Sequence, residues 1–352
     1  MSTTTPRSTG RRRAFAMAGA FAAATLVLGA CTNSSSDDGE ASGVSKSNTD
    51  NDKAGDTVVI GFSAPAADHG WMGAITKAAE AQAKQYDDVE LKVAEGTNDV
   101  NLQISQVETF INDKVDAIVL LPFDGAAMTA VALKAMEAGI TVINVDREFD
   151  SPFAARTTVL GDNYGMGVSA GTYACDEAAG DKDKVVAEIA GIDSLPLTQD
   201  RSRGFSDALK KCGLKVENRV AAEFTVESGE KAASNLLQAA PKIDFLWNHD
   251  DDQGVGVLAA IKNANRDEFV MIGGAGSANV MRDIKADNTV LKATVIYPST
   301  QAADGVKLAR LIVQGKAMSD LAEVEVPRKV QLAAPVVTKD NVDQYIGSAF
   351  ES

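Results

Sequence analysis

The sequence predicts an α/β protein made of two Rossmann-like lobes, each built on a parallel sheet. Short β-branched runs alternate with segments that carry apolar residues at helical spacing, which is the pattern of strands and their covering helices. The alternation pauses near residue 162 and then restarts, so two lobes are expected. About 295 residues beyond the N-terminal region are enough for two domains of ordinary size.

The first lobe is predicted to begin with four strands that alternate with three helices. Pro122 stops the third strand and Gly139 ends the third helix, as these residues commonly do. The expected strands cover residues 57–62, 91–94, 117–121 and 141–145, and the expected helices cover 71–86, 99–113 and 125–138.

The second lobe repeats the same rhythm after a short strand at 157–161. Pro298 then opens a last long helix to about Gln314, and strand-like segments follow near Val324 and Val336. The expected helices of this lobe cover residues 164–178, 200–211, 228–238, 253–263 and 279–285, and its strands lie at 184–190, near 216–224, and at 245–248, 269–273 and 291–297.

An acid and a base follow the apolar run at 141–145. Asp146 and Arg147 are therefore expected at the carboxyl end of a buried parallel strand, where open α/β sheets bind their ligands. Asp only accepts hydrogen bonds and Arg only donates them, whereas a sugar hydroxyl does both, so the pair suits a polyhydroxylated molecule. A surface salt bridge after a core strand is the alternative.

The N-terminus is typical of an exported protein. Residues 1–30 carry four arginines and no acid, followed by an apolar run that suits the core of a signal peptide. Small residues precede Cys31 as in the lipobox of bacterial lipoproteins, which this stretch resembles, so lipid on Cys31 is expected. Arg12 and Arg13 partly match a twin-arginine signal; Sec export and a transmembrane anchor stay open. The polar residues 31–56 are expected to be a disordered tether.

Composition excludes some partners. The chain has a formal net charge of −15. Without the four arginines of residues 1–30, it contains 30 basic and 49 acidic residues. Such a surface repels nucleic acid and anionic lipid.

Two cysteines beyond the lipobox could form a disulfide in an oxidising compartment. Cys175 and Cys212 both fall on predicted helices, so two buried thiols are the alternative.

Motifs for catalysis are weak. The first strand leads into Gly61-Phe62-Ser63 without the G-x-G-x-x-G pattern of dinucleotide sites, and no Walker loop occurs. His69 and His249 fall in different lobes, and adjacent acids at 250–252 point in different directions, unlike the alternate spacing of calcium loops. We expect no enzyme, no cofactor and no metal ion.

Several landmarks together resemble a known family. They are IGFS at 60–63, VINVDR at 142–147, GDN at 161–163, DRSRGF at 200–205 and the aspartates after Trp247. The chain resembles the periplasmic sugar-binding proteins of the ribose-binding type (periplasmic binding protein type I), the solute receptors of ABC importers. The resemblance implies two lobes joined by a three-segment hinge, with crossings near 162, near 297 and at 324–330. The lobes would then comprise 57–162 with about 298–326, and 163–297 with about 327–352.

The resemblance also implies binding residues. Asp146 and Arg147 match the pair that holds sugar hydroxyls, and Trp71 and Phe224 match aromatic rings that stack on the sugar. The full set carried over is His69, Trp71, Asp146, Arg147, Gln199, Phe224, Asp250 and Tyr297.

Some of these positions depart from the family pattern. His69 and Asp250 stand where asparagines are usual, Tyr297 replaces a glutamine and Gln199 an arginine. Ala275 replaces an aspartate that often binds a hydroxyl, while Arg201 matches an arginine usually regarded as structural. A ligand other than ribose is therefore plausible: another pentose, a hexose or a linear polyol.

The implied function is capture of a sugar or polyol by a lipid-anchored, monomeric, extracytoplasmic receptor that delivers it to an ABC transporter permease. Sugar-responsive repressors share the two-lobe core but begin with a basic DNA-binding motif, which the lipobox and acidic tether replace here. A receptor for a sugar-like signalling molecule, acting with a membrane sensor, stays open.

Overall fold

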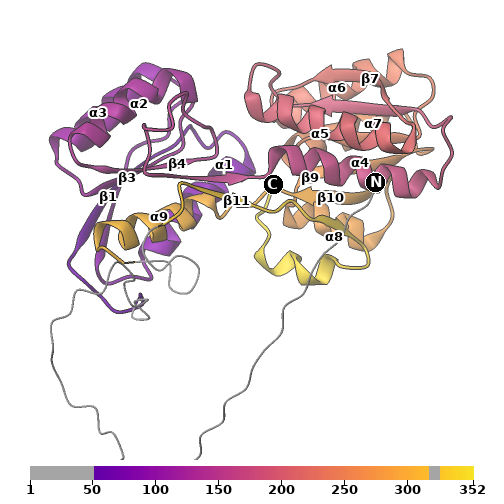
Figure 1. Cartoon of the computed structure of the whole chain (residues 1–352). Helices are drawn as coiled ribbons and strands as arrows, with labels where there is room; N and C mark the ends of the chain where they lie inside the picture. Colours follow the sequence, from indigo (N-terminus) through magenta and orange to yellow (C-terminus); the bar gives the residue numbers. More distant parts are fainter. Residues whose placement is uncertain (1–50, 317–325) are drawn as a thin grey trace, which may run out of the picture. The chain divides into compact units, whose positions relative to one another are not determined.

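The computed structural model describes residues 51–316 and 326–352, which form two six-stranded sheets (Figure 1). The strand order is β11-β5-β4-β3-β1-β2 in the first sheet and β12-β10-β9-β8-β6-β7 in the second. Every neighbouring pair is parallel except β10 and β12. The predicted fold class is thus confirmed.

The first lobe consists of the elements on the first sheet. Helices α1 and α9 pack on one face and α2 and α3 on the other, because strand residues alternate between the two cores, as Val119 and Ile118 of β3 do. Its elements are β1 (Val58–Ser63), α1 (Gly70–Ala83), β2 (Val89–Val93), α2 (Val100–Asn112), β3 (Ala117–Leu120), α3 (Gly125–Glu137), β4 (Thr141–Val145), β5 (Thr157–Gly161), α9 (Gln301–Val313) and β11 (Lys329–Leu332).

The second lobe is built in the same way. Helices α4 and α5 cover one face of the second sheet, and α6 and α7 cover the other. Its elements are α4 (Asn163–Ala178), β6 (Val186–Ala190), α5 (Pro196–Cys212), β7 (Val216–Ala221), α6 (Val226–Ala239), β8 (Phe245–Asn248), α7 (Asp251–Asn263), β9 (Val270–Ala275), α8 (Ala278–Ala286), β10 (Leu291–Ile296) and β12 (Val336–Thr338), and 3₁₀ turns at Val342–Gln344 and Ile346–Ser348 follow.

Within residues 51–316 and 326–352, the chain passes between the sheets three times. Two crossings, at Asp162 and after Tyr297, lie where they were expected. The third lies later than expected, between Leu332 and Val336, because 329–332 pairs with β5 of the first sheet. The expected boundary between the two lobes, near residue 326, is therefore too early in the chain. The strand-like segment expected near Val324 lies outside the described residues.

The first lobe starts before residue 57, where the tether was expected to end. Arg310 of α9 is only 2% exposed and forms a bidentate ion pair with Asp88, with both nitrogen–oxygen distances at 2.7 Å. The same guanidinium donates to the carbonyl oxygens of Asn51 (2.6 Å) and Lys53 (2.9 Å). A buried cation needs every donor satisfied, so residues 51–56 are held on the lobe. Residues 1–50, with Cys31, lie outside the described part of the chain.

Helices α4 and α5 approach each other very closely. A Cβ on Gly167 would lie 2.0 Å from the carbonyl oxygen of Arg201, and one on Gly204 would lie 2.1 Å from that of Tyr164. Only glycine permits this approach. Cys175 of α4 and Cys212 of α5 are bonded as a disulfide at the far end of the same helix pair.

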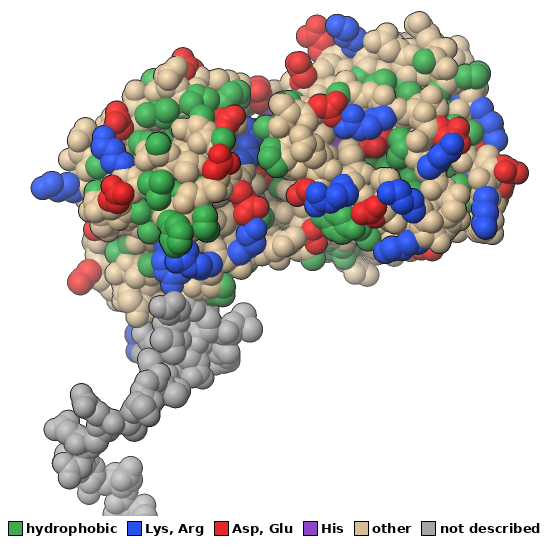
Figure 2. All heavy atoms as spheres, turned by 45° about the horizontal axis from the view of Figure 1, so that its top comes forward, with side chains coloured by type: hydrophobic (Ala, Val, Ile, Leu, Met, Phe, Trp, Pro, Cys, Tyr) green, Lys and Arg blue, Asp and Glu red, His purple; other side chains and the backbone are tan. Residues whose placement is uncertain are grey.

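The surface carries both signs of charge. On the face in Figure 2, basic and acidic side chains are interspersed, so that face offers no broad basic patch for nucleic acid. Among residues 51–316 and 326–352, no helix is long and apolar enough to span a membrane.

Breaking the disulfide should destabilise the second lobe. The bond closes a loop with a sequence separation of 37, for which chain entropy predicts a loss of about 2 to 4 kcal/mol. We expect a reducing agent to lower the melting temperature of the mature domain, and to have no further effect on the Cys175→Ala/Cys212→Ala variant. Two free thiols in the denatured, unreduced protein would contradict the bond.

Candidate ligand-binding site

The end of β4 presents an acid in an unusual backbone conformation. Asp146 has a φ of 65°, in the left-handed region that aspartate tolerates better than most residues. The turn is held by hydrogen bonds from the Asp146 amide to Val159 O (2.9 Å) and from Asn144 Nδ2 to Arg147 O (2.9 Å). Asp146 as a whole is 5% exposed. The sequence therefore places Asp146 at the carboxyl edge of the sheet, as predicted.

Arg147 has one donor in use and one without a partner. Its Nη1 donates to Phe123 O at 2.6 Å, which ties the guanidinium to the loop after β3. Its Nε lies 3.8 Å from Asp146 Oδ2, and this buried atom has no hydrogen-bond partner among the described residues. Because an unsatisfied buried donor is costly, a ligand hydroxyl that reached this Nε would be favoured.

Tyr297, at the second crossing, binds the carboxylate of Asp146 through its hydroxyl group. Its hydroxyl donates to Asp146 Oδ1 and accepts from Asn163 Nδ2 at 3.2 Å. Burial and the charge of Asp146 raise the pKa of this phenol far above its ordinary value. One oxygen of Asp146 is therefore occupied by the protein, and Oδ2 is the one left to bind a ligand.

Rings from both lobes surround the acid. Trp71, in the first turn of α1, lies 5.4 Å from the Tyr297 ring and donates its Nε1 to Tyr297 O at 3.1 Å. Phe224 of the second lobe has a φ of 63°, and its ring lies against Gly191, where any Cβ would fall 2.0 Å from the ring. Such rings suit the apolar C–H faces of sugars.

Arg201 of α5 also lines the site, and two of its nitrogens donate to other residues of the protein. Its Nε donates to Asn163 Oδ1 at 2.9 Å and its Nη1 to His249 O at 3.1 Å. The guanidinium lies 4.5 Å from the centre of the Tyr297 ring, a cation–π distance. These contacts give Arg201 the structural role that the resemblance implied.

The three adjacent aspartates point to different partners. Asp250 caps α7 by accepting from the amide of Gln253 at 3.1 Å. Asp251 accepts from the amides of Gly274, Gly276 and Ser277, each at 2.8 Å. Asp252 accepts from the amide of Trp71 at 3.0 Å and so caps α1 from the other lobe. In the described part of the chain, no group of three potential metal ligands is found.

The titration of Asp250 reflects its burial. Desolvation, together with the negative charge of Asp252, raises the pKa of Asp250 to about 7, and nearby His69 acts in the opposite direction. His69 itself is paired with Asp68, with Nδ1 and Oδ1 2.5 Å apart. The second histidine, His249, does not reach the site; it is fully buried and bonded to Glu188 at 2.9 Å.

Seven of the eight expected residues line one small cavity of about 30 Å³. Gln199 is the exception: it is exposed and donates to Asp193 O at 3.1 Å. The reason is helical phase, because Leu197 and Arg201 lie one turn apart on the cavity side of α5 and Gln199 lies between them. The cavity is lined by His69, Trp71, Met72, Asp146, Arg147, Leu197, Arg201, Phe224, Asp250 and Tyr297.

Sequence reasoning missed Met72 and Leu197, which line the cavity together with the expected residues. Met72 directly follows Trp71, and Leu197 is four residues before Arg201, so helical spacing on α5 was the available signal.

Replacing Asp250 should flatten the pH dependence of stability. Carboxyls in unfolded chains ionise near pH 4, whereas folded Asp250 keeps its proton to about 7, so its contribution to the free energy of unfolding falls as pH rises between these values. Asp250→Asn retains a capping side chain. We expect urea unfolding to show a shallower fall from about pH 4.5 to 7.5 in this variant than in the wild type.

The matched control is Asp99→Asn, which alters the exposed aspartate that caps α2. It should keep the wild-type slope. Equal slopes for Asp250→Asn and the wild type would show that Asp250 ionises normally.

Comparisons with known proteins identify the family of this chain. The profile of the periplasmic binding protein domain matches residues 60–317. The D-ribose/D-allose-binding protein of Pseudomonas aeruginosa is 29% identical over 222 residues, covering 62% of this chain and 69% of that protein. The ribose import binding protein of Bacillus subtilis is 28% identical over 254 residues, covering 70% and 81%.

Solved structures share the fold. A solute-binding protein of an ABC transporter from Mycobacterium smegmatis, with bound glycerol, has a TM-score of 0.74 and 26% identity, covering 84% of this chain and 99% of that one. The fructose-binding periplasmic domain of a hybrid two-component system has a TM-score of 0.71 and 25% identity, covering 82% and 92%. With two parallel-sheet lobes and a profile match over most of its length, this chain belongs to the periplasmic binding protein domain family.

Proposed function

We propose that this protein is an extracytoplasmic solute-binding lipoprotein that captures a sugar or polyol between its lobes and delivers it to an ABC transporter permease. The observation that supports this most is the cavity where Asp146 and Arg147 meet Trp71, Phe224 and Tyr297. Relatives named as ribose- or allose-binding proteins, and an ABC transporter solute-binding protein among the structures, favour the same function.

The hydroxyl groups of the solute would bind to groups that the protein leaves available. Asp146 Oδ2 accepts a hydrogen bond, and the unpartnered Nε of Arg147 donates one. The protonated form of Asp250 can both donate and accept, since its pKa is raised to about 7. Trp71 and Phe224 would face the apolar sides of the ring.

Solute entry requires the lobes to move apart. The cavity holds about 30 Å³, far less than the roughly 300 to 1,000 Å³ of pockets that bind small molecules. Two contacts of Trp71, with Asp252 and with Tyr297 O, connect the first lobe to the second lobe and the hinge. We propose that they break on opening, and that a solute with higher affinity for the closed form shifts the population toward it.

A ligand screen with an arginine variant tests the function. Thermal shift of the mature domain against pentoses, hexoses, polyols, inositols and amino acids should show a selective rise of a few degrees with one sugar or polyol. For that ligand, Arg147→Ala should weaken binding by about tenfold or more, because a hydrogen bond to a charged group contributes about 1.5 to 3 kcal/mol.

The matched control is Arg328→Ala, which removes another arginine that donates to a backbone carbonyl, that of Pro152 at 3.0 Å. It should leave the affinity unchanged. Equal affinity in the wild type and Arg147→Ala would show that the Asp-Arg pair does not bind the ligand. If no compound of the panel shifted the melting temperature, sugar binding would be contradicted.

Export and anchoring belong to the same proposal. Residues 1–30 would direct export, lipid on Cys31 would hold the monomer at the membrane, and residues 32–50 would connect it to the folded domain.

Removing the lipid site tests the anchor. In the native host, the wild type should fractionate with membranes and incorporate labelled palmitate, whereas Cys31→Ala should do neither because it lacks the thiol that is modified. Equal palmitate labelling of both forms would contradict lipidation at Cys31.

A sensor role is the second candidate, favoured by the likeness to the fructose-binding domain of a two-component system. It would use the same cavity and the same closure. Crosslinking in cells distinguishes the two functions: a permease partner supports import, and a membrane kinase supports signalling.

A further inference from the structure

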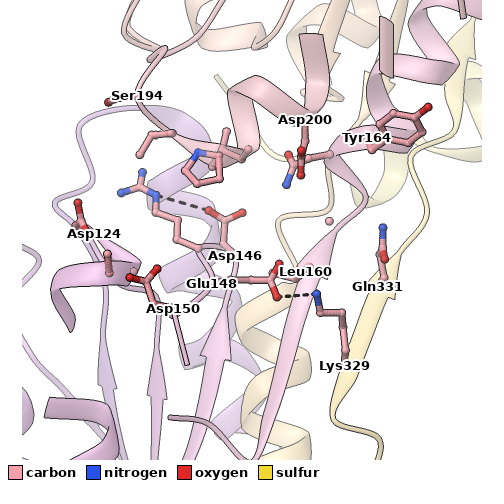
Figure 3. Close-up of a pocket in the computed structure, with 18 residues that line it drawn as sticks. Asp124, Asp146, Glu148, Asp150, Leu160, Tyr164, Ser194, Asp200, Lys329 and Gln331 are labelled. Carbon is pink, nitrogen blue, oxygen red and sulfur yellow. Dashed lines mark ion pairs between the residues drawn. The ribbon is translucent and has the colours of Figure 1, made fainter. Parts of the chain in front are cut away.

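A second and larger hollow adjoins the small cavity. It holds about 430 Å³, and three residues line both spaces: Asp146, Arg147 and Leu197. We call it the chamber. Figure 3 shows that both lobes contribute, with Asp124 and Asp150 from the first and Ser194 and Asp200 from the second. The other lining residues are Gly125, Ala126, Glu148, Leu160, Gly161, Asn163, Tyr164, Leu195, Pro196, Lys329 and Gln331.

The chamber differs from the small cavity in its chemistry. Trp71, Phe224 and Tyr297 line the small cavity, whereas Tyr164 is the one aromatic residue among the lining residues of the chamber. The chamber instead carries carboxylates along its walls, which accept hydrogen bonds from hydroxyl groups. A sugar ring that needs two apolar faces therefore fits the small cavity once it opens, and the chamber suits a polar group attached to that ring.

The charges in the chamber are unbalanced. Glu148 is paired with Lys329 at 2.6 Å, and Asp146 is beside Arg147 (Figure 3). Asp200 is paired with Arg203, at 2.8 Å, outside the lining. Five acids and two bases line the space. An anionic group would meet repulsion there, whereas neutral hydroxyls would find acceptors.

Two of these acids keep oxygen atoms available. Asp124 uses Oδ1 to cap α3 through the amide of Ala127, at 2.9 Å, which leaves its Oδ2 for other donors. Asp150 forms no ion pair with any residue of 51–316 or 326–352. Asp146 lines both the small cavity and the chamber. Its Oδ1 accepts from Tyr297, and its Oδ2 lies toward Arg147, which also lines both spaces.

We propose that the chamber is a second subsite that takes a neutral, hydroxylated substituent on the sugar held in the small cavity. The solute is then a glycoside or disaccharide of two units, and solutes whose second unit bears a phosphate or carboxylate are rejected. The chamber volume lies within the range of pockets that bind small molecules, unlike the small cavity. This inference rests on the proposed function, because it needs a sugar in the first subsite.

Filling the chamber with a large side chain tests the inference. Ala126 is exposed in the first turn of α3 and lines the chamber, so Ala126→Trp would occupy part of the space without touching the small cavity. Ser194→Trp fills it from the second lobe. Ala127→Trp is the matched control, since Ala127 is the next exposed residue of the same turn and lines neither space.

Titration calorimetry would compare galactose with lactose and galactobiose, xylose with xylobiose, and myo-inositol with galactinol. Wild type should bind one two-unit solute about tenfold or more tightly than its single unit. Ala126→Trp and Ser194→Trp should lose that gain while single-unit affinity changes by less than about twofold, and Ala127→Trp should change neither. Lactose that carries a phosphate on its glucose unit, which is the second unit, should not bind better than galactose.

The outcomes separate the two proposals. Tight binding of a single sugar with no gain from a second unit, or a gain that survives both chamber-filling variants, would overturn the subsite and leave the receptor function standing. Absence of binding by every single-unit and two-unit solute would overturn the proposed function and the subsite together.

Discussion

The hydrogen bond from the Tyr297 hydroxyl to Asp146 joins the hinge to the binding site, and much of the cleft depends on it. Tyr297 follows β10 at the second crossing, Asp146 ends β4 of the first lobe, and Asn163 begins α4 of the second. The phenol donates to Asp146 and accepts from Asn163, so one hydroxyl connects both lobes. An unpaired buried carboxylate would be costly, so this bond also permits the burial of Asp146.

Two residues of the small cavity have strained backbone conformations. Asp146 and Phe224 are non-glycine residues with φ values of 65° and 63°, and each such conformation costs about 1 to 3 kcal/mol. Close packing of α4 on α5 then fixes Asn163 and Arg201 relative to each other. Side chains that are already fixed in their binding positions lose little conformational entropy when a solute binds, and this preorganisation favours affinity.

The strand and helix alternation could be predicted from the sequence, and with it the position of Asp146 and Arg147 at the end of β4. Gln199 was expected in the site and is not there, because the rotation of α5 about its axis is decided by packing against α4. The third crossing was expected too early, since nothing in residues 329–332 indicates which sheet they join; their partner β5 is about 170 residues earlier in the chain.

The sequence by itself determined the fold class, the net negative charge and the residue types available for binding hydroxyls, because these follow from local periodicity and composition. Tertiary structure decided which of those residues face one another. The three neighbouring aspartates have different roles: Asp250 caps α7, Asp251 holds the turn after β9, and Asp252 caps α1 of the other lobe. Their partners come from segments far apart in the chain, so only long-range packing could assign these roles, as it also sets the sizes of the small cavity and the chamber.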